Sequence, residues 1–416
     1  MEEEIVKIIG REIIDSRGYP TVEAELHTKH RIVYASVPSG ASTGKFEAHE
    51  LRDGDNKRFM GKGVLKAVNN INTIISSALI GQDAVDQKKI DEMLIELDGT
   101  KDKSRLGANT ILAVSIAVAK CTRHGLYDPA SLPVPLVNIL NGGVHADNEL
   151  AIQEFMIVPV NANSFKHAVQ ISAEIFHVLK KTLSDNSLST NLGDEGGFAP
   201  QLKNHKEALD YIMQSIEKAG YKTAKDVYIA LDAASSEFYK NNIYELKGKK
   251  KKLDSDQLIK FYEELTSSYP IISIEDPMAE DDLDGWKNIT KCLGSKIQLV
   301  GDDLFVTNTT KLEEGINNDI ANSILIKLNQ IGTVTETKNA IALAKKNQYT
   351  TIVSHRSGET EDSFIAEFSA QTGSDQIKTG SMARSERLSK YNELIRIEER
   401  LDFIKYKGKY AFPFLK

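Results

Sequence analysis

The chain is poor in cysteine, and this argues against several kinds of site. Its 416 residues include two cysteines, Cys121 and Cys292, which lie far apart and belong to no metal-binding or redox motif. We therefore expect neither a disulfide framework nor a cysteine-based zinc site. A chain of this length buries a substantial core without crosslinks, so we interpret both residues as buried free thiols in a reducing compartment.

Long hydrophobic runs and a targeting segment are also missing. The most continuous apolar stretch, Ile111 to Ala119, is interrupted by Ser115 and is shorter than the ~20 residues that span a bilayer. The opening residues, MEEEIVKI, are acidic and lack the basic start and apolar core of a signal peptide. We therefore expect a cytoplasmic protein without a membrane span.

Basic residues are fewer than acidic residues, which gives the chain a formal net charge of −7. This argues against nucleic acid as a partner, because binding to it requires a basic face. An anionic substrate would need a site made locally positive by metal ions and a few placed Lys and Arg residues. We interpret the one basic run, LKGKKKKL at Leu246–Leu253, as a solvated loop; the alternative is a polyanion patch.

The residues that are present divide the chain into two parts. Alternating and β-rich residues predict paired strands at Thr21–His27 and Arg31–Val37. Helical patterns follow at Gly63–Leu79, Asp86–Leu97 and Asn109–Arg123, the last apolar on most sides. Pro129, Pro133 and Pro135 then interrupt regular structure. We place the domain boundary there, with an α+β domain in residues 1–128 and a second domain in residues 136–416.

The second part alternates short β-branched runs with amphipathic segments of helical length, a pattern typical of an α/β fold with a parallel sheet. No Gly-rich dinucleotide turn follows the first strand, which favours a closed barrel over an open sheet. The predicted strands are Ile152–Val158, Tyr228–Ala230, Ile271–Ile274, Ile297–Val300, Ser323–Ile326, Thr350–Val353 and Gln376–Ile377.

Charged residues follow six of these strands: Asp232, Glu275, Asp302, Lys327, His355 and Lys378. From the second onward they lie 27, 25, 28 and 23 residues apart, about one βα unit each. The carboxyl ends of barrel strands surround a single pocket, where active sites lie. One such charge usually just meets solvent, but six in register predict one charged mouth.

The residue types at this mouth predict a metal site with a base beside it. Asp232, Glu275 and Asp302 offer the oxygen ligands that Mg²⁺ prefers. Positive neighbours and burial would lower the pKa of Lys327 and Lys378, and a neutral lysine can act as a general base. A structural calcium site, or lysines that merely pair with the carboxylates, are the alternatives.

An acidic glycine-rich loop, LGDEGGFAP, adds a candidate acid. Its glycines permit a tight turn and a close approach to a ligand. Asp194 and Glu195 stand before them, so an acid here could face a lysine across the pocket.

Ten motifs in order along the chain resemble those of the enolase family. They are DSRG (Asp15–Gly18), PSGASTG (Pro38–Gly44), NGGVHADN (Asn141–Asn148), IQEFMIVP (Ile152–Pro159), LGDEGGFAP (Leu192–Pro200), IEDP (Ile274–Pro277), GDDLFVTN (Gly301–Asn308), IKLNQIGT (Ile326–Thr333), SHRSGET (Ser354–Thr360) and IKTGS (Ile377–Ser381). The resemblance implies a small α+β N-terminal domain followed by a modified TIM-type barrel, ββαα(βα)6.

The same resemblance implies an activity: the reversible, magnesium-dependent dehydration of 2-phosphoglycerate to phosphoenolpyruvate in glycolysis and gluconeogenesis, with two Mg²⁺ per active site. Asp232, Glu275 and Asp302 match the ligands of the first ion. Ser39, in the PSGASTG loop, matches the residue that closes over the site and joins the second ion with the substrate phosphate. A homodimer or homo-octamer is also implied.

Catalytic roles follow from the resemblance too. Lys327 matches the base that removes the C2 proton, and Glu195 the acid that helps the C3 hydroxyl to leave, with Glu154 beside it. Glu195 must then carry a proton, and a crowded carboxylate site raises the pKa of one member. The matched substrate contacts are Gln153, His145, His355, Lys378 and, for the phosphate, Arg356 and Ser357.

The chain departs from the family pattern at two points, and two alternatives to the implied function are open. Tyr19 stands where the family often has Asn, and the chain is somewhat short for the family. A racemase or sugar-acid dehydratase would share the barrel metals, but the complete SHRSGET and GDEGGFAP motifs argue against it. The family is also known for cell-surface binding through lysines, and Lys416 ends this chain. A secondary cell-surface or secreted pool is therefore a further expectation.

Overall fold

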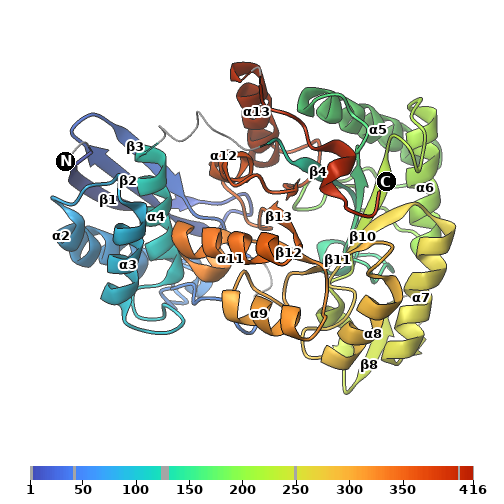
Figure 1. The fold of residues 1–416 in the computed structure, drawn as a ribbon, viewed down its shortest axis with the longest axis horizontal. Helices are drawn as coiled ribbons and strands as arrows, with labels where there is room; N and C mark the ends of the chain where they lie inside the picture. The colour runs from blue at the N-terminus through green and yellow to red at the C-terminus, as the bar shows by residue number, and fades with distance from the viewer. Residues whose placement is uncertain (1–2, 41–43, 123–130, 248–250, 402, 416) are drawn as a thin grey trace.

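An antiparallel sheet backed by helices forms the N-terminal part of the molecule, coloured blue to cyan in Figure 1. The computed structural model describes residues 3–40, 44–122, 131–247, 251–401 and 403–415. The sheet runs in the order β1 (Ile5–Ile14), β2 (Pro20–Thr28) and β3 (Ile32–Ser36). The two predicted strands are β2 and β3. The prediction missed β1, whose sequence IVKIIGREII alternates poorly.

The predicted helices are present, and the last of them joins the two parts of the molecule. They are a helix running through α1 (Leu65–Asn70), a π-turn (Ile71–Ile75) and α2 (Ser76–Leu79), then α3 (Gln87–Asp98) and α4 (Ala108–Cys121). Nearly every residue of α4 is buried. It packs on β2 and β3 and also contacts α10 (Leu328–Ile331) and α11 (Val334–Lys346) of the second part. Its apolar composition on all sides is explained by this double contact.

Eight strands close into a barrel in the second part, in the spatial order β10-β11-β12-β13-β14-β4-β5-β6. β5 runs antiparallel to β4 and β6, and the other neighbours are parallel. The strands are β4 (Val134–Asn141), β5 (Glu154–Val158), β6 (Tyr228–Asp232), β10 (Ile271–Glu275), β11 (Gln298–Gly301), β12 (Ser323–Ile326), β13 (Thr350–Ser354) and β14 (Gln376–Lys378).

Helices surround the barrel and complete the predicted order ββαα(βα)6, so the α/β fold class is confirmed. Six of them begin after a side chain that accepts a backbone N–H of the first turn, namely Ser164, Asn204, Asp254, Asp282, Asn308 and Thr333. Besides α11, the helices are α5 (Phe165–Asp185), α6 (His205–Lys218), α7 (Ser255–Ser268), α8 (Leu283–Leu293), α9 (Thr309–Asn317), α12 (Phe364–Gln371) and α13 (Ser385–Arg400).

Two local predictions differ from the structure. Pro135 was expected to interrupt regular structure, yet it lies inside β4, near the first residue of the strand, where proline is tolerated. Residues 123–130, with Pro129, lie outside the described residues. Part of the basic run is strand β9 (Lys251–Leu253), which pairs with β8 (Ile243–Leu246) between β6 and α7, while residues 248–250 lie outside the described residues.

The barrel interior is filled by an apolar cluster. Its members include Met156 on β5, Ala230 on β6, Val300 on β11 and Leu325 on β12. The chain's last described segment covers the end where the strands begin, because Gln376 Nε2 donates to the carbonyl oxygen of Ala411 at 2.7 Å. The charged residues lie at the opposite end of the barrel, where the parallel strands end.

Truncation of this interior is expected to destabilise the fold without touching the mouth. Leu325 is fully buried, so Leu325→Ala should lower the free energy of unfolding by about 2–5 kcal/mol, through lost burial and a residual cavity. Leu283, which is 51% exposed, is the matched control. Leu283→Ala should change the free energy of unfolding by no more than about 0.5 kcal/mol. Urea unfolding followed by circular dichroism measures both, and equal losses would contradict the assignment of Leu325 to the core.

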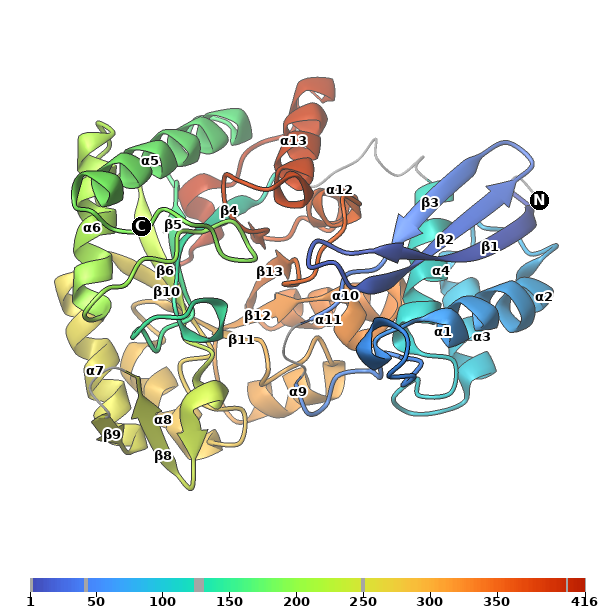
Figure 2. The ribbon, with the colours of Figure 1, turned by 180° about the vertical axis from the view of Figure 1, so that it is seen from behind.

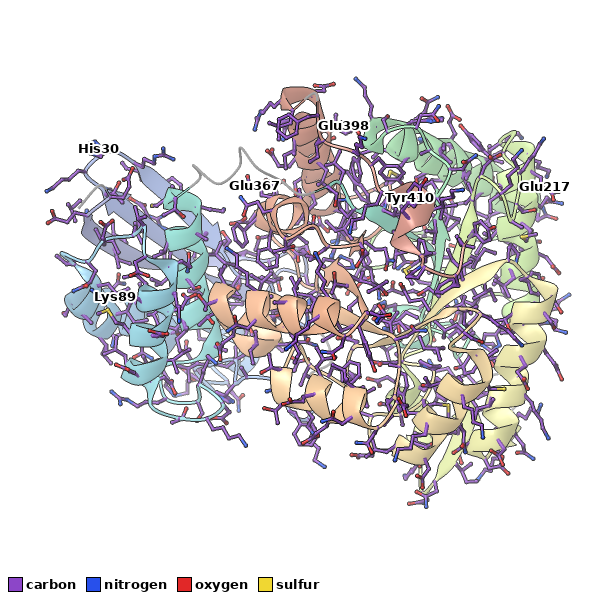
Figure 3. The ribbon with its side chains drawn as sticks, viewed as in Figure 1. His30, Lys89, Glu217, Glu367, Glu398 and Tyr410 are labelled. Atoms are coloured by element: carbon purple, nitrogen blue, oxygen red, sulfur yellow. The ribbon has the colours of Figure 1, made fainter. Side chains whose placement is uncertain are left out.

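The two parts lie side by side, with α4 beside α10 and α11 at their border (Figure 2). Polar side chains cover the outside, as Lys89 does on α3 and Glu217 on α6 (Figure 3). Among the described residues, no helix is both long and apolar enough to cross a membrane.

Candidate active site

The alternation of side chains along each strand directs several of the charged residues toward the barrel axis. Alternate residues of a strand point to the same face. Asp232, Asp302 and Lys327 each follow a member of the interior cluster by two positions, so they point toward the barrel axis. On the reversed strand β5, Glu154 precedes the interior residue Met156 by two and reaches the same end.

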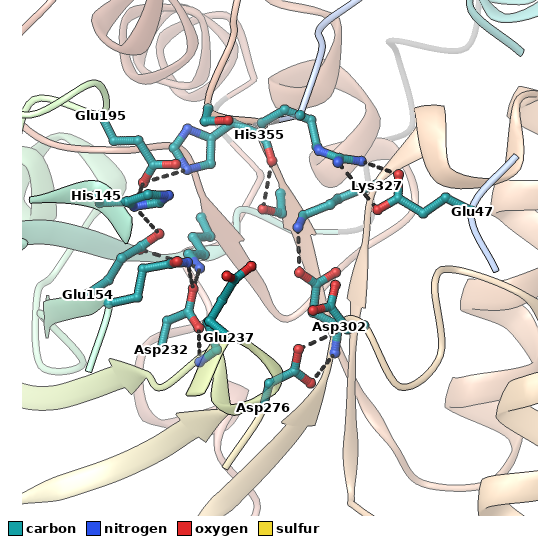
Figure 4. Close-up of a pocket in the computed structure, with 18 residues that line it drawn as sticks. Glu47, His145, Glu154, Glu195, Asp232, Glu237, Asp276, Asp302, Lys327 and His355 are labelled. Carbon is teal, nitrogen blue, oxygen red and sulfur yellow. Dashed lines mark hydrogen bonds and ion pairs between the residues drawn. The ribbon is translucent and has the colours of Figure 1, made fainter. Parts of the chain in front are cut away.

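The structure brings most of the predicted site residues to one pocket at this end of the barrel. Figure 4 shows Glu195, His145 and Glu154 at one side of the pocket and Lys327 with Asp302 at the other. Glu275 lies in contact with Lys378, which lines the pocket. The predicted residues that line the pocket are His145, Gln153, Glu154, Glu195, Asp232, Asp302, Lys327, His355, Arg356, Ser357 and Lys378.

A lysine ammonium lies among carboxylates from three adjacent strands. Lys378 Nζ is 2.9 Å from Asp232 Oδ2, 2.9 Å from Glu275 Oε2 and 3.3 Å from Glu154 Oε2. Asp232 pairs in register with Glu154 on one side and with Glu275 on the other, which is why these side chains meet. Gln153 Nε2 also donates to Asp232 Oδ2, at 3.2 Å.

The charges in this group shift each other's pKa values. Burial alone would lower the pKa of Lys378, but the carboxylates of Asp232, Glu154 and Glu275 raise it well above its usual value. Burial, together with the neighbouring charge of Asp232, raises the pKa of Glu275 to about 8. The group therefore holds one firmly protonated lysine among acids that compete for protons.

Lys327 and Asp302 form a close ion pair across neighbouring strands. Lys327 Nζ lies 2.5 Å from Asp302 Oδ2, and Gln330 Nε2 donates to Asp302 Oδ1 at 2.9 Å. Burial would lower the pKa of Lys327, but the carboxylate of Asp302 raises it above the usual value. The expectation of lowered lysine pKa values is thus wrong for this arrangement, because the nearest charges to both lysines are carboxylates.

Two further aspartates belong to the pocket and were missed from the sequence. The carboxylate of Asp276 accepts the backbone N–H groups of Asp302 and Asp303, both at 2.9 Å. Carboxylate oxygens of these three residues lie within 4.8 Å of one another, a spacing that could hold a cation. Asp276 and Asp303 directly follow the predicted ligands Glu275 and Asp302, so extending each strand-end search by one residue would have found them.

The other side of the pocket combines two acids with two histidines. His145 Nδ1 lies 3.6 Å from Glu154 Oε1 and 3.9 Å from Glu195 Oε2, and His355 Nε2 lies 3.5 Å from Glu195 Oε2. Asn138 Nδ2 donates to Glu195 Oε2 at 3.2 Å. Burial, with Glu195 close by, raises the pKa of Glu154 well above its usual value. Of the two acids, Glu154 is therefore the one whose protonated form the surroundings favour.

Arg356 meets an acid from the N-terminal part. Its NH1 lies 2.9 Å from Glu47 Oε2, and its NH2 donates to Glu47 Oε1 at 3.3 Å. Glu47 also lines the pocket, so both parts of the molecule build it. No pattern in the sequence marks Glu47, because the contact joins residues 309 positions apart.

Ser39 is the predicted residue that the structure places elsewhere. Its backbone pairs with Gly358, through N–H···O distances of 2.7 and 2.9 Å. Its hydroxyl donates to Glu50 Oε2 at 3.2 Å and accepts from Arg52 NH2 at 2.9 Å, and the residue is 2% exposed. Ser42 and Thr43 of the same motif lie outside the described residues.

Comparison with known families matches both parts of this architecture. Residues 5–126 match the enolase N-terminal domain, and residues 129–413 match the enolase C-terminal TIM barrel domain. The chain belongs to the enolase family. It is accordingly an enolase-type hydro-lyase. Enolase family proteins bind Mg²⁺, and the acidic groups at the mouth could hold such an ion.

Proposed function

We propose that this enolase-type lyase interconverts 2-phosphoglycerate and phosphoenolpyruvate, as a step of glycolysis and gluconeogenesis in the cytoplasm. The observation that carries the proposal is the placement of a lysine and an acid pair on opposite sides of one buried, charged pocket (Figure 4). Removal of a proton at one carbon and loss of hydroxide at the next requires a base and an acid that flank the same two carbons. Lys327 and the Glu154–Glu195 pair line the same pocket, which supports this proposal.

The donor set fits a magnesium ion. Asp232, Glu275 and Asp302 supply buried carboxylate oxygens from three consecutive barrel strands, and hard oxygen ligands are those that Mg²⁺ prefers. When bound, the metal supplies positive charge that stabilises the extra negative charge of the substrate carboxylate as the C2 proton leaves. We propose these three residues as ligands of a first Mg²⁺ and Ser39 as a ligand of a second.

Lys327 is proposed as the base that takes the C2 proton. To act, it must first be neutral, and its tight pairing with Asp302 opposes this. Any cation that shares the oxygens of Asp302 weakens that pairing and lowers the pKa of Lys327. The same carboxylate would thereby hold the metal and control the base.

Glu195 is proposed as the acid that helps the C3 hydroxyl to leave, with Glu154 as its proton reserve. Oxygens of the two carboxyl groups lie within 4.8 Å of one another, together with an imidazole nitrogen of His145. A pair this close holds one proton between its members rather than two separate charges. Movement of that proton from Glu154 to Glu195 would prepare the acid.

The remaining residues are proposed as substrate contacts. Arg356 and Ser357 would bind the phosphate, and Lys378 the carboxylate end. Gln153, His145 and His355 would complete the contacts. A homodimer or homo-octamer, and a secondary cell-surface or secreted pool, are also proposed from family membership; Lys416 lies outside the described residues.

The test is a direct assay of the purified protein. Addition of 2-phosphoglycerate with Mg²⁺ should produce the growing ultraviolet absorbance of phosphoenolpyruvate, and an excess of chelator should stop it. No phosphoenolpyruvate in the presence of Mg²⁺ would overturn the proposed function. Product formation from a sugar acid instead would favour the dehydratase alternative.

Ser39→Ala is expected to lower kcat by up to about 10²-fold while leaving the affinity for the first Mg²⁺ nearly unchanged. The Ser39 hydroxyl is bound to Glu50 and Arg52, so it must leave these partners before it reaches the pocket. Steady-state kinetics and titration calorimetry measure the two quantities. Ser36→Ala, on β3 and outside the pocket lining, is the control. Unchanged turnover in Ser39→Ala would show that this loop has another role.

A further inference from the structure

One fully buried arginine joins the two loops that carry the acid and the histidine of the pocket. Arg387, on α13, is 0% exposed. Its NH1 lies 2.6 Å from His355 Nδ1 and donates to the carbonyl oxygen of Arg356 at 2.6 Å. Its NH2 donates to the carbonyl oxygens of Ser357 at 2.7 Å and Asp194 at 3.1 Å. One guanidinium therefore fixes the backbone beside Glu195 and the segment 355–357.

This contact determines where the proton of His355 resides. A guanidinium has five N–H donors and no acceptor, so Nδ1 of His355 must be the acceptor. The ring hydrogen then lies on Nε2, which faces Glu195 Oε2 at 3.5 Å. Burial lowers the pKa of His355 to about 4, which is consistent with a neutral ring.

The resulting N–H is available for a ligand. His355 Nε2 is buried and makes no hydrogen bond within the described residues, since its distance to Glu195 Oε2 is long. Buried donors are rarely left unsatisfied, and such groups tend to tighten their contacts when a substrate binds. With hydrogen already on Nε2, the neutral ring of His355 does not accept a proton at that nitrogen. The proton shared by Glu154 and Glu195 therefore stays within the acid pair.

We propose that Arg387 is a positioning residue of this site, which holds His355 in the Nε2–H tautomer and keeps that N–H directed at Glu195. The inference rests on the proposed function for its consequence in turnover. Its structural part, the tautomer of His355, stands on the contacts of Arg387 alone.

Lys390 provides a matched comparison on the same helix. It is also a fully buried cation, and it lies three residues after Arg387 on α13. Its Nζ lies 2.9 Å from Glu359 Oε2 and donates to the carbonyl oxygens of Thr360 and Glu386. None of these three contacts reaches His355, so loss of Lys390 removes a buried cation and leaves the tautomer in place.

The experiment combines ¹⁵N NMR of labelled histidines with steady-state kinetics on the full chain. The wild-type His355 signals, identified by their absence in His355→Gln, should show hydrogen on Nε2 and none on Nδ1. In Arg387→Met both tautomers should appear, and kcat should fall by about 10²-fold with a smaller change in KM. Arg387→Lys, which keeps the positive charge on a single donor nitrogen, should recover part of the loss. Lys390→Met should lower thermal stability and retain the wild-type His355 signals.

Hydrogen on Nδ1 of His355 in the wild-type protein would overturn the proposal whether or not any variant folds. An unchanged tautomer in folded Arg387→Met, or a loss of kcat no larger than the loss of folded protein, would also overturn it. The NMR measurement uses no substrate. Failure of the wild-type protein to convert 2-phosphoglycerate would therefore count against the proposed function and not against the role of Arg387 in the tautomer.

Discussion

Lys327→Ala is expected to lose both phosphoenolpyruvate formation and exchange of the C2 hydrogen of 2-phosphoglycerate with deuterated water. Glu195→Gln is expected to lose product formation and keep measurable exchange. If the lysine removes the C2 proton, a carbanion-like intermediate forms before the hydroxyl leaves, and only the second step needs the acid. Loss of a positioned acid or base typically costs about 10²- to 10⁴-fold in rate, so both effects should be well resolved.

The measurement is NMR of 2-phosphoglycerate in deuterated water, alongside the absorbance assay. Lys346→Ala and Glu313→Gln, both exposed and outside the pocket lining, remove the same charges without touching the site and should behave as the wild type. The two sides of the pocket could in principle exchange their roles, because both flank the same carbons. Exchange that survives in Lys327→Ala and is lost in Glu195→Gln would mean that our assignment of base and acid is reversed.

Asp302→Asn is expected to lower activity by about 10²-fold or more. The substitution removes a proposed metal ligand, and metal charge stabilisation is worth several kcal/mol in such reactions. It also removes the negative partner of Lys327. The fold should survive, since the side chain lies at the mouth and an asparagine oxygen can still accept from Gln330. Calorimetry should show weakened Mg²⁺ binding, and kinetics the loss of kcat.

A control carboxylate exists at the other end of the barrel. Asp375 precedes β14, accepts the backbone N–H of Thr351 at 2.9 Å and pairs with Lys407 at 2.6 Å. Asp375→Asn should reduce stability and leave Mg²⁺ affinity unchanged. Full activity of Asp302→Asn, or of the wild type in excess chelator, would contradict the metal assignment.

The sequence predicted the barrel well because parallel strands carry two signals together, an apolar run and a charge at its end. Seven of the eight strands were located from their apolar runs, and six of these, all except the antiparallel β5, lead into one of the predicted charged residues. β4 was missed because Pro133 and Pro135 hide its start, and β1 because its apolar residues alternate poorly. The meeting of Asp232, Asp302 and Lys327 followed from topology alone, since carboxyl ends of neighbouring strands share one edge.

The parts of the site that escaped prediction depend on three-dimensional packing. The contact of Glu47 with Arg356 joins segments that are distant in the sequence, and no local sequence pattern predicts it. The raised pKa of Glu154 results from burial and the neighbouring charge of Glu195, which a sequence does not display. The role of Arg387 depends on its hydrogen bonds to two loops, which no local sequence pattern indicates.

The pocket wall contributed by Glu47 and Gly40 has a consequence for protein engineering. TIM-type barrels are often treated as independent scaffolds whose catalytic residues all lie on their own strands and loops. Here the barrel excised at the proline segment would expose the face that α4 covers and would leave Arg356 without its carboxylate neighbour. A chimaera that exchanges barrels between relatives should therefore transfer both parts together, because the smaller part supplies Gly40 and Glu47 of the pocket lining.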